Sequence, residues 1–460
     1  MKVIQFIYNL LWGDLFTLTF GDTKIGISLL VLLLIPTGIY FTIRTKFLMI
    51  RFFPEMLRLT AEKKTGGKSS VSGVQALIVS TATRVGMGNL VGVVAALSLG
   101  GAGAVFWMWV TAIIGASTAF IEATLAQIHR EPDALYGGHH GGPAYYMHNF
   151  FAKGKKKSVL AVLFALSGLI CWGGISQVIG NSVTEGFYNA FEIKPIYVTV
   201  VMVILAAIIV LRKNATVKVL DVLVPIMAAF YFIISIYIIV KNISLMPSVL
   251  RDIVHEAFGI KQVVAGGFGA VLMNGVKRGL FSNEAGSGSA PCASASGEVS
   301  HPAKAGLLQA FGVFIDTIVI CTCTAMIMLL APRDILSGAI GIKLLQDAMQ
   351  HHFGYAGVVF VAITLALFCF STFIGILYYA RSNVSYLFGN SMKAQTIYKI
   401  FALAMLFVGG LAAYTFVWDI GDIGVGLMTV FNILALYPMA HQALDSLKDY
   451  TQIMKERKNK

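Results

Sequence analysis

Two long apolar stretches of this 460-residue chain are interrupted near their middles by glycine-rich polar residues. The first runs from Ser72 to Leu99 and is interrupted at Arg84–Asn89, and the second runs from Gln262 to Ala290 and is interrupted at Asn274–Ser289. Backbone groups without hydrogen bonds are costly in hydrocarbon, so such segments are tolerated only inside the protein or along a cavity. Two interrupted helices at corresponding places in two halves of a chain are typical of the binding site of a secondary transporter.

The composition places the chain in a membrane. Hydrophobic residues make up 57% of it and charged residues 12%, whereas roughly 25% of residues are charged in an average soluble domain. Apolar segments of about 20 residues, the length a membrane helix needs, occur eleven times and are far longer than barrel strands. The sequence therefore predicts an all-α integral membrane fold in one transmembrane domain over residues 1–460. The eleven predicted transmembrane helices are 25–43, 73–99, 102–128, 158–188, 195–211, 217–240, 262–290, 303–331, 355–380, 397–417 and 422–440.

Lysine and arginine are distributed unevenly between the loops. Most of the 35 fall in the segments 44–70, 129–157, 212–218, 277–304, 381–399 and 441–460, and cytoplasmic loops are the ones that carry such an excess. We therefore expect a plasma membrane protein with its amino terminus outside and a cytoplasmic tail at 441–460. The net charge of +13 then needs no nucleic acid, because cytoplasmic lysines such as Lys155, Lys156 and Lys157 can face anionic lipid headgroups.

The predicted spans divide into one leading helix, 25–43, and two groups of five, 73–240 and 262–440. Because five is odd, the two groups must have opposite orientations in the membrane, and the first span of each is the interrupted one. This arrangement is the inverted repeat with two discontinuous helices that sodium-coupled transporters of the leucine-transporter type have. The prediction depends on the number of spans, their parity and the positions of the breaks.

Several runs of residues also carry a family resemblance. They are Ala82–Val93, Gly100–Val110 and Gly141–Met147 in the first half, and Arg278–Pro291 and Phe314–Thr322 in the second. In this order they are similar to the signatures of the alanine:cation symporter family, also called sodium:alanine symporters. The resemblance implies a leucine-transporter-like fold of eleven spans that takes up small neutral amino acids with sodium or protons.

The resemblance also implies which residues contact the amino acid. They are Gly86, Met87, Gly88 and Asn89 in the first break and Phe281, Ser282, Asn283 and Glu284 in the second, with Phe281 covering the substrate as a gate. Interrupted helix ends offer N–H groups to a carboxylate and carbonyls to an ammonium group or a sodium ion, and glycines let the backbone approach a ligand. The alternative is a packing kink between close helices, where small residues are also favoured.

Two departures from the family pattern concern this pocket. Family members commonly have threonine at the position of Met87. Their substrate-contacting glutamine usually stands two residues before the asparagine that matches Asn181, where this chain has Ile179. Gln177 is the nearby candidate for the glutamine's role, and the alternative is a polar side chain that bonds a neighbouring helix.

A third departure bears on specificity. In the run Phe370–Tyr379, alanine carriers of the family usually have tryptophan where this chain has Ile376, and the tryptophan ring closes the pocket over a small side chain. We therefore expect a neutral substrate somewhat larger than alanine or glycine, such as glutamine or a branched-chain amino acid.

Sodium sites in transporters use unwound backbone carbonyls, and hydroxyl oxygens can complete the set. Ser371 and Thr372 are the candidate hydroxyl ligands, with carbonyls near Thr83 and Gly86 opposite them. The alternative is that both hydroxyls only bond the carbonyl one turn back, as serine and threonine often do in membrane helices. The sequence leaves sodium and proton coupling open, and it suggests no cofactor and no other metal.

Charged residues inside the spans are functional candidates because charge is costly in a bilayer. Glu284 belongs to the second break, and we expect Asp316 to be structural, accepting hydrogen bonds from neighbouring helices. Glu122 is either a gate partner or an acceptor that holds the fold together. Arg84 either pairs with a gate carboxylate or extends toward the interface.

Other classes of protein fit less well. A channel needs a continuous pore, and a membrane enzyme needs a nucleophile and base or a metal set, whereas no histidine stands in a central span. An ATP-driven pump would need a loop of the form GxxxxGK[ST], which the sequence lacks. We therefore predict a secondary symporter that imports a small neutral amino acid with sodium by alternating access. The alternative is a proton-coupled or differently selective carrier on the same fold, and the oligomeric state stays open.

Overall fold

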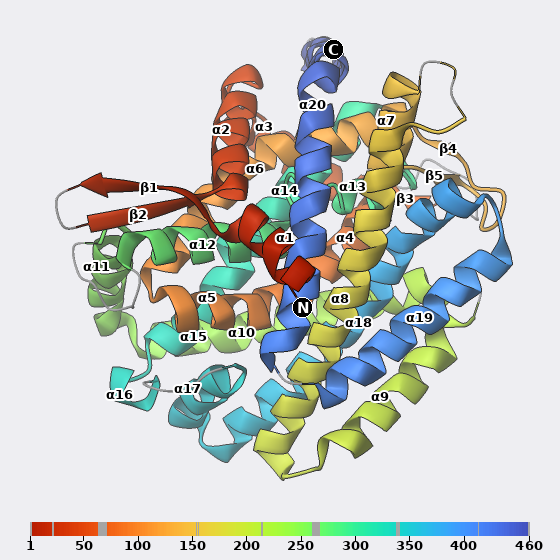
Figure 1. Cartoon of the computed structure of the whole chain (residues 1–460). Helices are drawn as coiled ribbons and strands as arrows, with labels where there is room; N and C mark the ends of the chain where they lie inside the picture. The colour runs from red at the N-terminus through yellow and green to blue at the C-terminus, as the bar shows by residue number, and fades with distance from the viewer. Residues whose placement is uncertain are drawn as a thin grey trace.

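Long helices make up most of the molecule (Figure 1). The computed structural model describes residues 2–20, 23–62, 71–152, 154, 156–212, 215–259, 267–336, 341–412 and 414–458. The uninterrupted long helices are α6 (Gly103–Ile128), α8 (Val159–Phe191), α9 (Pro195–Val210), α10 (Ala215–Lys241), α18 (Tyr355–Phe388), α19 (Met392–Leu411) and α20 (Tyr414–Lys458). Among these, α8 packs along both α20 and α19, and α6 packs against α20.

Shorter elements lie at the ends and sides of this bundle. The helices among them are α1 (Lys2–Trp12), α2 (Leu29–Arg44), α3 (Leu48–Thr60), α7 (Pro143–Phe151), η2 (Ile243–Leu245), α11 (Met246–Ala257), α16 (Arg333–Leu336) and α17 (Lys343–Phe353). Strands β1 (Asp14–Phe20) and β2 (Thr23–Ser28) form an antiparallel pair. Two further pairs are short, the parallel β3 (Val71–Ser72) with β6 (Gly297–Glu298) and the antiparallel β4 (Glu131–Pro132) with β5 (His139–His140).

The outer surface of the bundle is apolar. Large hydrophobic side chains such as Tyr197, Ile204, Ile226 and Ile233 are exposed along α9 and α10, where a soluble monomer would rarely show so large an apolar patch. By length and composition six of the described helices can cross a membrane, or up to eight if two bent helix pairs each count as one span. The chain is thus a helical multi-pass membrane protein, and the number eleven stays a prediction.

The leading helix begins later than predicted. Residues 25–28 belong to strand β2, and the helix α2 starts at Leu29, where Ser28 Oγ accepts a hydrogen bond from Val31 N at 3.3 Å. Serine is a good helix cap because its oxygen satisfies an N–H group of the first turn. Hydropathy alone does not find this boundary, since Ile25 and Ile27 of β2 extend the apolar run of the helix toward the amino terminus.

The first interrupted span stays helical but changes its type. It consists of α4 (Gly73–Thr83), the π-helix η1 (Arg84–Gly92) and α5 (Val93–Gly100). The predicted unwinding at Arg84–Asn89 is therefore wrong in form, because the backbone widens there instead of leaving the helix. A π-helix shifts backbone hydrogen bonds from their α-helical partners and is frequent at functional sites.

The second interrupted span breaks later than predicted. Its first part, α12 (Gly267–Asn283), is a regular helix through most of the predicted interruption, and α13 (Ala290–Ser294) follows the non-helical segment 284–289. Positive φ angles at Glu284 (57°), Gly286 (94°) and Gly288 (81°) turn the chain out of the helix there, and such angles favour glycine. A further π-helix, η3 (Phe314–Cys321), lies between α14 (Pro302–Val313) and α15 (Thr322–Leu329) and was not predicted.

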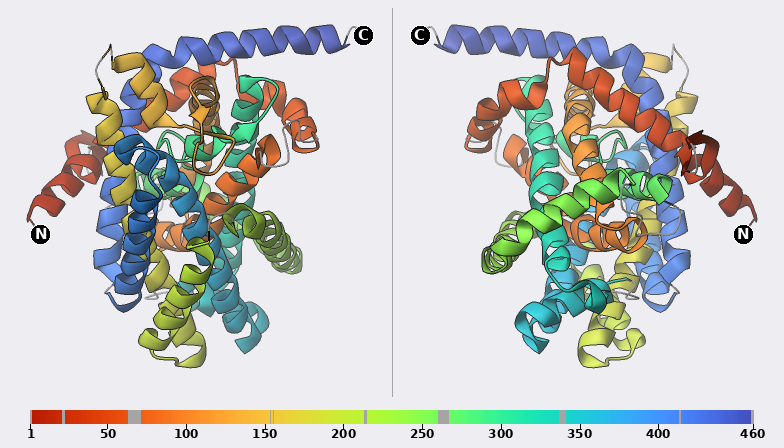
Figure 2. Two further views of the ribbon diagram at one scale, coloured as in Figure 1. Left: turned by 90° about the vertical axis from the view of Figure 1, so that its right-hand side faces the viewer. Right: turned by 90° about the vertical axis from the view of Figure 1, so that its left-hand side faces the viewer.

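The C-terminal part of α20 lies across one end of the bundle (Figure 2). Pro438 stands inside this helix, and proline removes a helical hydrogen bond and favours a bend. Beyond it, α20 docks on α3 through the buried carboxylate of Glu55. Arg457 Nη2 donates to Glu55 Oε2 at 2.8 Å, Tyr450 OH donates to Glu55 Oε1 at 2.5 Å, and Arg58 Nη2 donates to Glu55 Oε1 at 2.7 Å.

This docking should depend on pH. Burial by itself raises the pKa of Glu55, but the hydrogen bonds from Arg58, Arg457 and Tyr450 outweigh it and lower the pKa from 4.5 to about 2. Because the docked carboxylate has the lower pKa, docking is fully stable above about pH 5 and weakens as the pH falls toward about 2. We expect spin labels at Leu57 and Ile453 to keep one short distance at neutral pH and to separate only in strong acid. The Glu55→Gln variant should show the separated distance already at neutral pH, and separation of the native pair near pH 6 would contradict the assignment.

Candidate functional site

The two interrupted spans meet backbone to backbone at Gly88. A methyl group on Gly88 would lie 3.1 Å from the carbonyl oxygen of Phe281 and 3.2 Å from the Cα atom of Ser282. The π-helix η1 can therefore approach the end of α12 this closely only because residue 88 has no side chain. The Asn89 amide joins the same elements, since Ser282 Oγ donates to Asn89 Oδ1 at 2.8 Å. Candidate residues from both breaks thus lie side by side.

The π-helix η3 packs against both breaks. Asn89 Nδ2 donates to the backbone oxygen of Asp316 at 3.1 Å. Ser282 Oγ lies 3.3 Å from Thr317 Oγ1 and 3.0 Å from Cys321 Sγ. All of these residues are buried. The side chains of two breaks and the wide turn of a third helix therefore form one buried polar network.

Arg84, at the start of η1, is completely buried and faces two carboxylates. Its Nη1 lies 3.4 Å from Asp316 Oδ2 and its Nε lies 3.8 Å from Glu284 Oε2. Its Nη2 donates to Gln309 Oε1 at 3.1 Å, and Tyr379 OH donates to Glu284 Oε2 at 3.1 Å. A charge in such a place is tolerated only when it is paired. Of the two possibilities for Arg84, pairing is confirmed.

The non-helical segment 284–289 is held from two sides. Glu122 Oε2 on α6 accepts a hydrogen bond from Gly286 N at 3.1 Å, and Asn432 Nδ2 on α20 donates to Gly286 O at 3.0 Å and also to Glu122. Glu122 is therefore an acceptor that holds the fold. Asn283, the last residue of α12, accepts from Ala285 N at 3.0 Å, whereas its buried Nδ2 has no hydrogen-bond partner among the described residues.

The candidate sodium ligands of α18 adjoin η1. Thr372 Oγ1 accepts from Met87 N at 3.0 Å and donates to Phe368 O at 2.9 Å, and a methyl group on Gly86 would come within 2.0 Å of Thr372 Oγ1. Ser371 Oγ also donates to Phe368 O, at 2.8 Å. The hydroxyls thus bond a carbonyl one turn back, but Thr372 in addition binds the backbone of the π-helix. The side chain of Thr83 lies outside the part of the chain that the structure describes.

Phe281, the predicted gate, packs against an aromatic residue of α20. The ring centroids of Phe281 and Trp418 are 5.2 Å apart, and the Arg278 guanidinium lies 4.0 Å from the Trp418 centroid. Arg278 Nη1 and Lys277 Nζ share Asp422, at 3.3 Å and 2.5 Å from its oxygens. A buried cationic cluster therefore stands beside the gate.

Three further candidates have different surroundings. Met87 and Ile376 are buried, and Ile376 lies one turn after Thr372, so it belongs to the face of α18 that meets η1. Gln177 instead donates from Nε2 to Met405 Sδ on α19 at 3.3 Å. No described contact brings Gln177 to either break, which fits the alternative of a side chain that bonds a neighbouring helix.

Sequence reasoning missed several partners of the site. They are Gln309, Tyr379, Trp418, Asp422 and Asn432. Asp422 could have been predicted, because a carboxylate in an apolar span needs a partner. Tyr379 could also have been predicted, because it is the last residue of a run that the resemblance had already singled out. The amide and indole side chains gave no signal, since each meets its partner only through the tertiary fold.

Comparison with known proteins identifies the family of the chain. The family described as the sodium:alanine symporter family matches residues 16–460. The chain is 41% identical over 435 residues to a probable sodium/glutamine symporter, GlnT, of Bacillus subtilis, covering 94% of this chain and 90% of the relative. It is 40% identical over 426 residues to the amino-acid carrier protein AlsT of the same organism, covering 92% and 90%. The sodium/alanine symporter AgcS of Methanococcus maripaludis is 34% identical over 438 residues, covering 94% and 96%.

Solved structures show a related fold. MhsT in complex with L-phenylalanine has a TM-score of 0.53 at 14% identity, covering 82% of this chain and 98% of that one. A manganese transporter of Eremococcus coleocola has a TM-score of 0.52 at 13% identity, covering 83% and 81%. At these identities the likeness concerns the fold alone, which is that of the leucine-transporter-like transporters.

Proposed function

Because the chain belongs to the sodium:alanine symporter family, we propose that it imports a small neutral amino acid together with sodium by alternating access. It is a multi-pass membrane transporter and not an enzyme. The distribution of lysine and arginine supports a plasma membrane location with residues 441–460 in the cytoplasm. The interrupted spans support one leading helix followed by two inverted five-helix repeats.

The observation that carries this proposal is the contact at Gly88 between η1 and the last turn of α12, directly before the break at 284–289. There η1 and the end of α12 approach without an intervening side chain, and Asn89 and Ser282 offer hydrogen-bonding groups beside them. Backbone groups that leave regular helical pairing can bind the two charged ends of an amino acid. Asn283 Nδ2, a buried donor without a partner among the described residues, can serve the carboxylate. Gly86, Met87, Gly88, Asn89, Phe281, Ser282, Asn283 and Glu284 remain the proposed contacts, with Phe281 as the gate.

Sodium is proposed to bind between η1 and α18. The Thr372 hydroxyl already links the backbone at Met87 to the carbonyl of Phe368 through two hydrogen bonds. A cation near Thr372 and Gly86 would connect the same two helices through its ligands in place of these hydrogen bonds. The charged groups nearby also suit a cation, because one guanidinium, that of Arg84, faces two carboxylates and leaves a net negative charge. Two of the relatives are named as sodium symporters, one for glutamine and one for alanine, which supports sodium as a coupled ion.

The proposed substrate is glutamine or a neutral amino acid of similar size. Ile376 supports this choice, since its side chain is smaller than the tryptophan usual in alanine carriers of the family, and the relative of 41% identity is named as a probable glutamine symporter. The test is uptake of labelled glutamine and alanine into proteoliposomes under an inward sodium gradient, with choline replacing sodium in parallel. Both uptakes should require sodium.

The Ile376→Trp variant should become selective for alanine. A ring at this position takes the volume of the larger substrate side chain, and excess volume in a packed site costs about 1–3 kcal/mol, so glutamine uptake should fall roughly 10- to 100-fold. Alanine uptake should stay within about threefold. The readout is the ratio of the two uptake rates at equal amounts of folded protein.

The matched control is Ile363→Trp on the lipid-facing side of the same helix, where the side chain is 49% exposed. It should leave the glutamine-to-alanine ratio unchanged. Native protein that transports only alanine and glycine would refute the assignment of a larger substrate. Uptake that is equal in sodium and in choline would refute sodium coupling.

A further inference from the structure

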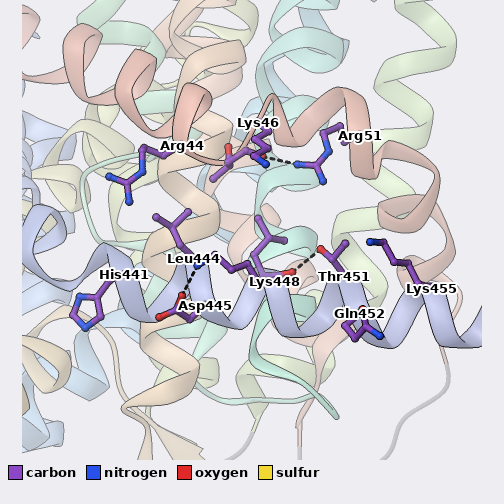
Figure 3. A pocket seen from close by; sticks show the side chains of 12 residues that line it. Arg44, Lys46, Arg51, His441, Leu444, Asp445, Lys448, Thr451, Gln452 and Lys455 are labelled. Carbon is purple, nitrogen blue, oxygen red and sulfur yellow. Dashed lines mark hydrogen bonds and ion pairs between the residues drawn. The ribbon is translucent and has the colours of Figure 1, made fainter.

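A pocket of about 510 Å³ lies between the corner that joins α2 to α3 and the C-terminal part of α20 (Figure 3). Its lining contains none of the residues of the proposed transport site, and it lies at the end of the bundle where the charge distribution predicts the cytoplasm. Arg44, Lys46 and Arg51 line one wall, and Lys448 and Lys455 line the other. We refer to it as the basic pocket.

The charges of the basic pocket are not balanced within the protein. Asp445 is the one acidic residue in its lining, and it pairs with Lys448 at 2.9 Å. Among the described residues, Arg44, Lys46, Arg51 and Lys455 form no ion pair. On the other flank of α3 the situation is the opposite, because Arg58 and Arg457 both pair with Glu55. Like charges that converge without a partner attract a polyvalent anion.

The wall on the α2–α3 side also presents apolar side chains outward. Lys46 and Phe47 both have φ angles of 55°, an uncommon left-handed conformation, and α2 and α3 meet there at 73°. This sharp corner leaves Ile43 60%, Phe47 57% and Ile50 78% exposed, each next to a basic residue of the pocket. Figure 2 shows the opposite wall, the end of α20, lying across the bundle and not along it. Basic groups with exposed apolar side chains beside them complement a phospholipid, because the basic groups can bind its anionic headgroup and the apolar side chains can contact its acyl chains.

We propose that the basic pocket binds the phosphate headgroup of an anionic phospholipid, whose acyl chains pass over Ile43, Phe47 and Ile50. The phosphate accepts hydrogen bonds from Arg51 on one wall and Lys455 on the other, because guanidinium and ammonium groups are strong donors to phosphate oxygens. The bound lipid holds α20 on the α2–α3 corner, opposite the flank that Glu55 holds. The chemistry would also suit a free phosphate ester, but the exposed apolar residues favour the lipid.

The test is a titration of the purified full chain in a neutral detergent with dioctanoyl phosphatidylglycerol, followed by the thermal midpoint of unfolding. We expect a saturable rise of the midpoint for the native protein. The double variant Arg51→Gln with Lys455→Gln should bind roughly 30-fold more weakly, given the usual contribution of each basic residue near an anionic surface. The matched control, Lys194→Gln with Lys393→Gln, removes two exposed charges elsewhere and should bind like the native protein.

Two further measurements test the site and the identity of its ligand. The Asp445→Asn variant removes the acidic residue of the lining and should bind more tightly than the native protein. Dioctanoyl phosphatidylcholine and glycerol phosphate should both bind much more weakly than phosphatidylglycerol. Equal binding by the two double variants would overturn the site, tight binding of phosphatidylcholine would overturn the requirement for an anion, and tight binding of glycerol phosphate would overturn the lipid in favour of a soluble ester. None of these readouts depends on amino acid transport.

Discussion

Replacement of Arg84 by methionine is expected to abolish transport and to lower the free energy of unfolding by about 3–5 kcal/mol. Arg84 is completely buried and lies within 3.8 Å of Glu284 and 3.4 Å of Asp316. Removing the guanidinium leaves the buried carboxylate of Asp316 and the partly buried carboxylate of Glu284 without this cation. It also leaves Gln309 without a donor that now reaches its amide oxygen at 3.1 Å.

The measurement combines uptake with thermal unfolding in detergent. Arg84→Lys keeps the charge but not the shape of the guanidinium, so it should recover part of the stability and little of the transport. Arg251→Met, on the exposed surface of α11, is the matched control and should change neither. If Arg84→Met were as stable as the native protein, the charge network described above would not be a structural element of the fold.

Gly86→Ala is expected to lower uptake roughly 10- to 100-fold and to raise the sodium concentration for half-maximal uptake. The added methyl group would lie 2.0 Å from Thr372 Oγ1 and 3.1 Å from the carbonyl oxygen of Phe368. The hydroxyl would have to turn away, and the helix backbone of α18 would have to move. Both atoms belong to the region that we propose for sodium.

Gly92→Ala is the matched control in the same π-helix. A methyl group there meets only the Phe281 ring, at the ordinary contact distance of 3.8 Å, so transport should be close to normal. Uptake should be measured over a range of sodium concentrations for both variants. A Gly86→Ala protein with unchanged sodium dependence would place the ion elsewhere.

The sequence predicted the class of fold and the neighbourhood of the site, but not the form of the breaks. Glycines 86 and 88 correctly marked the place where the backbones of two spans meet. Hydropathy does not distinguish an α-helix from a π-helix, so η1 and η3 could not be predicted. The polar residues Asn274–Asn283 suggested unwound chain, whereas they form helix because Lys277 and Arg278 reach Asp422, far along the chain.

Partners that are distant in sequence limit any such prediction in the same way. Gln309 and Tyr379 reach Arg84 and Glu284 through contacts that only the folded chain creates. Gln177 shows the reverse case, because a polar residue near the expected position lies instead against Met405. Residue type and spacing thus identified the helices that build the site more reliably than the side chains inside it.

A single guanidinium ties together the parts of the molecule that would be expected to move. Arg84 belongs to the first interrupted span, Glu284 to the second and Asp316 to η3, and Tyr379 adds α18 through Glu284. Moving any of these segments away from the others would leave a carboxylate without its cation in the protein interior, where water cannot solvate it. We therefore expect these segments to move together in a transport cycle, with the surface along which they slide lying outside the group that Arg84 connects.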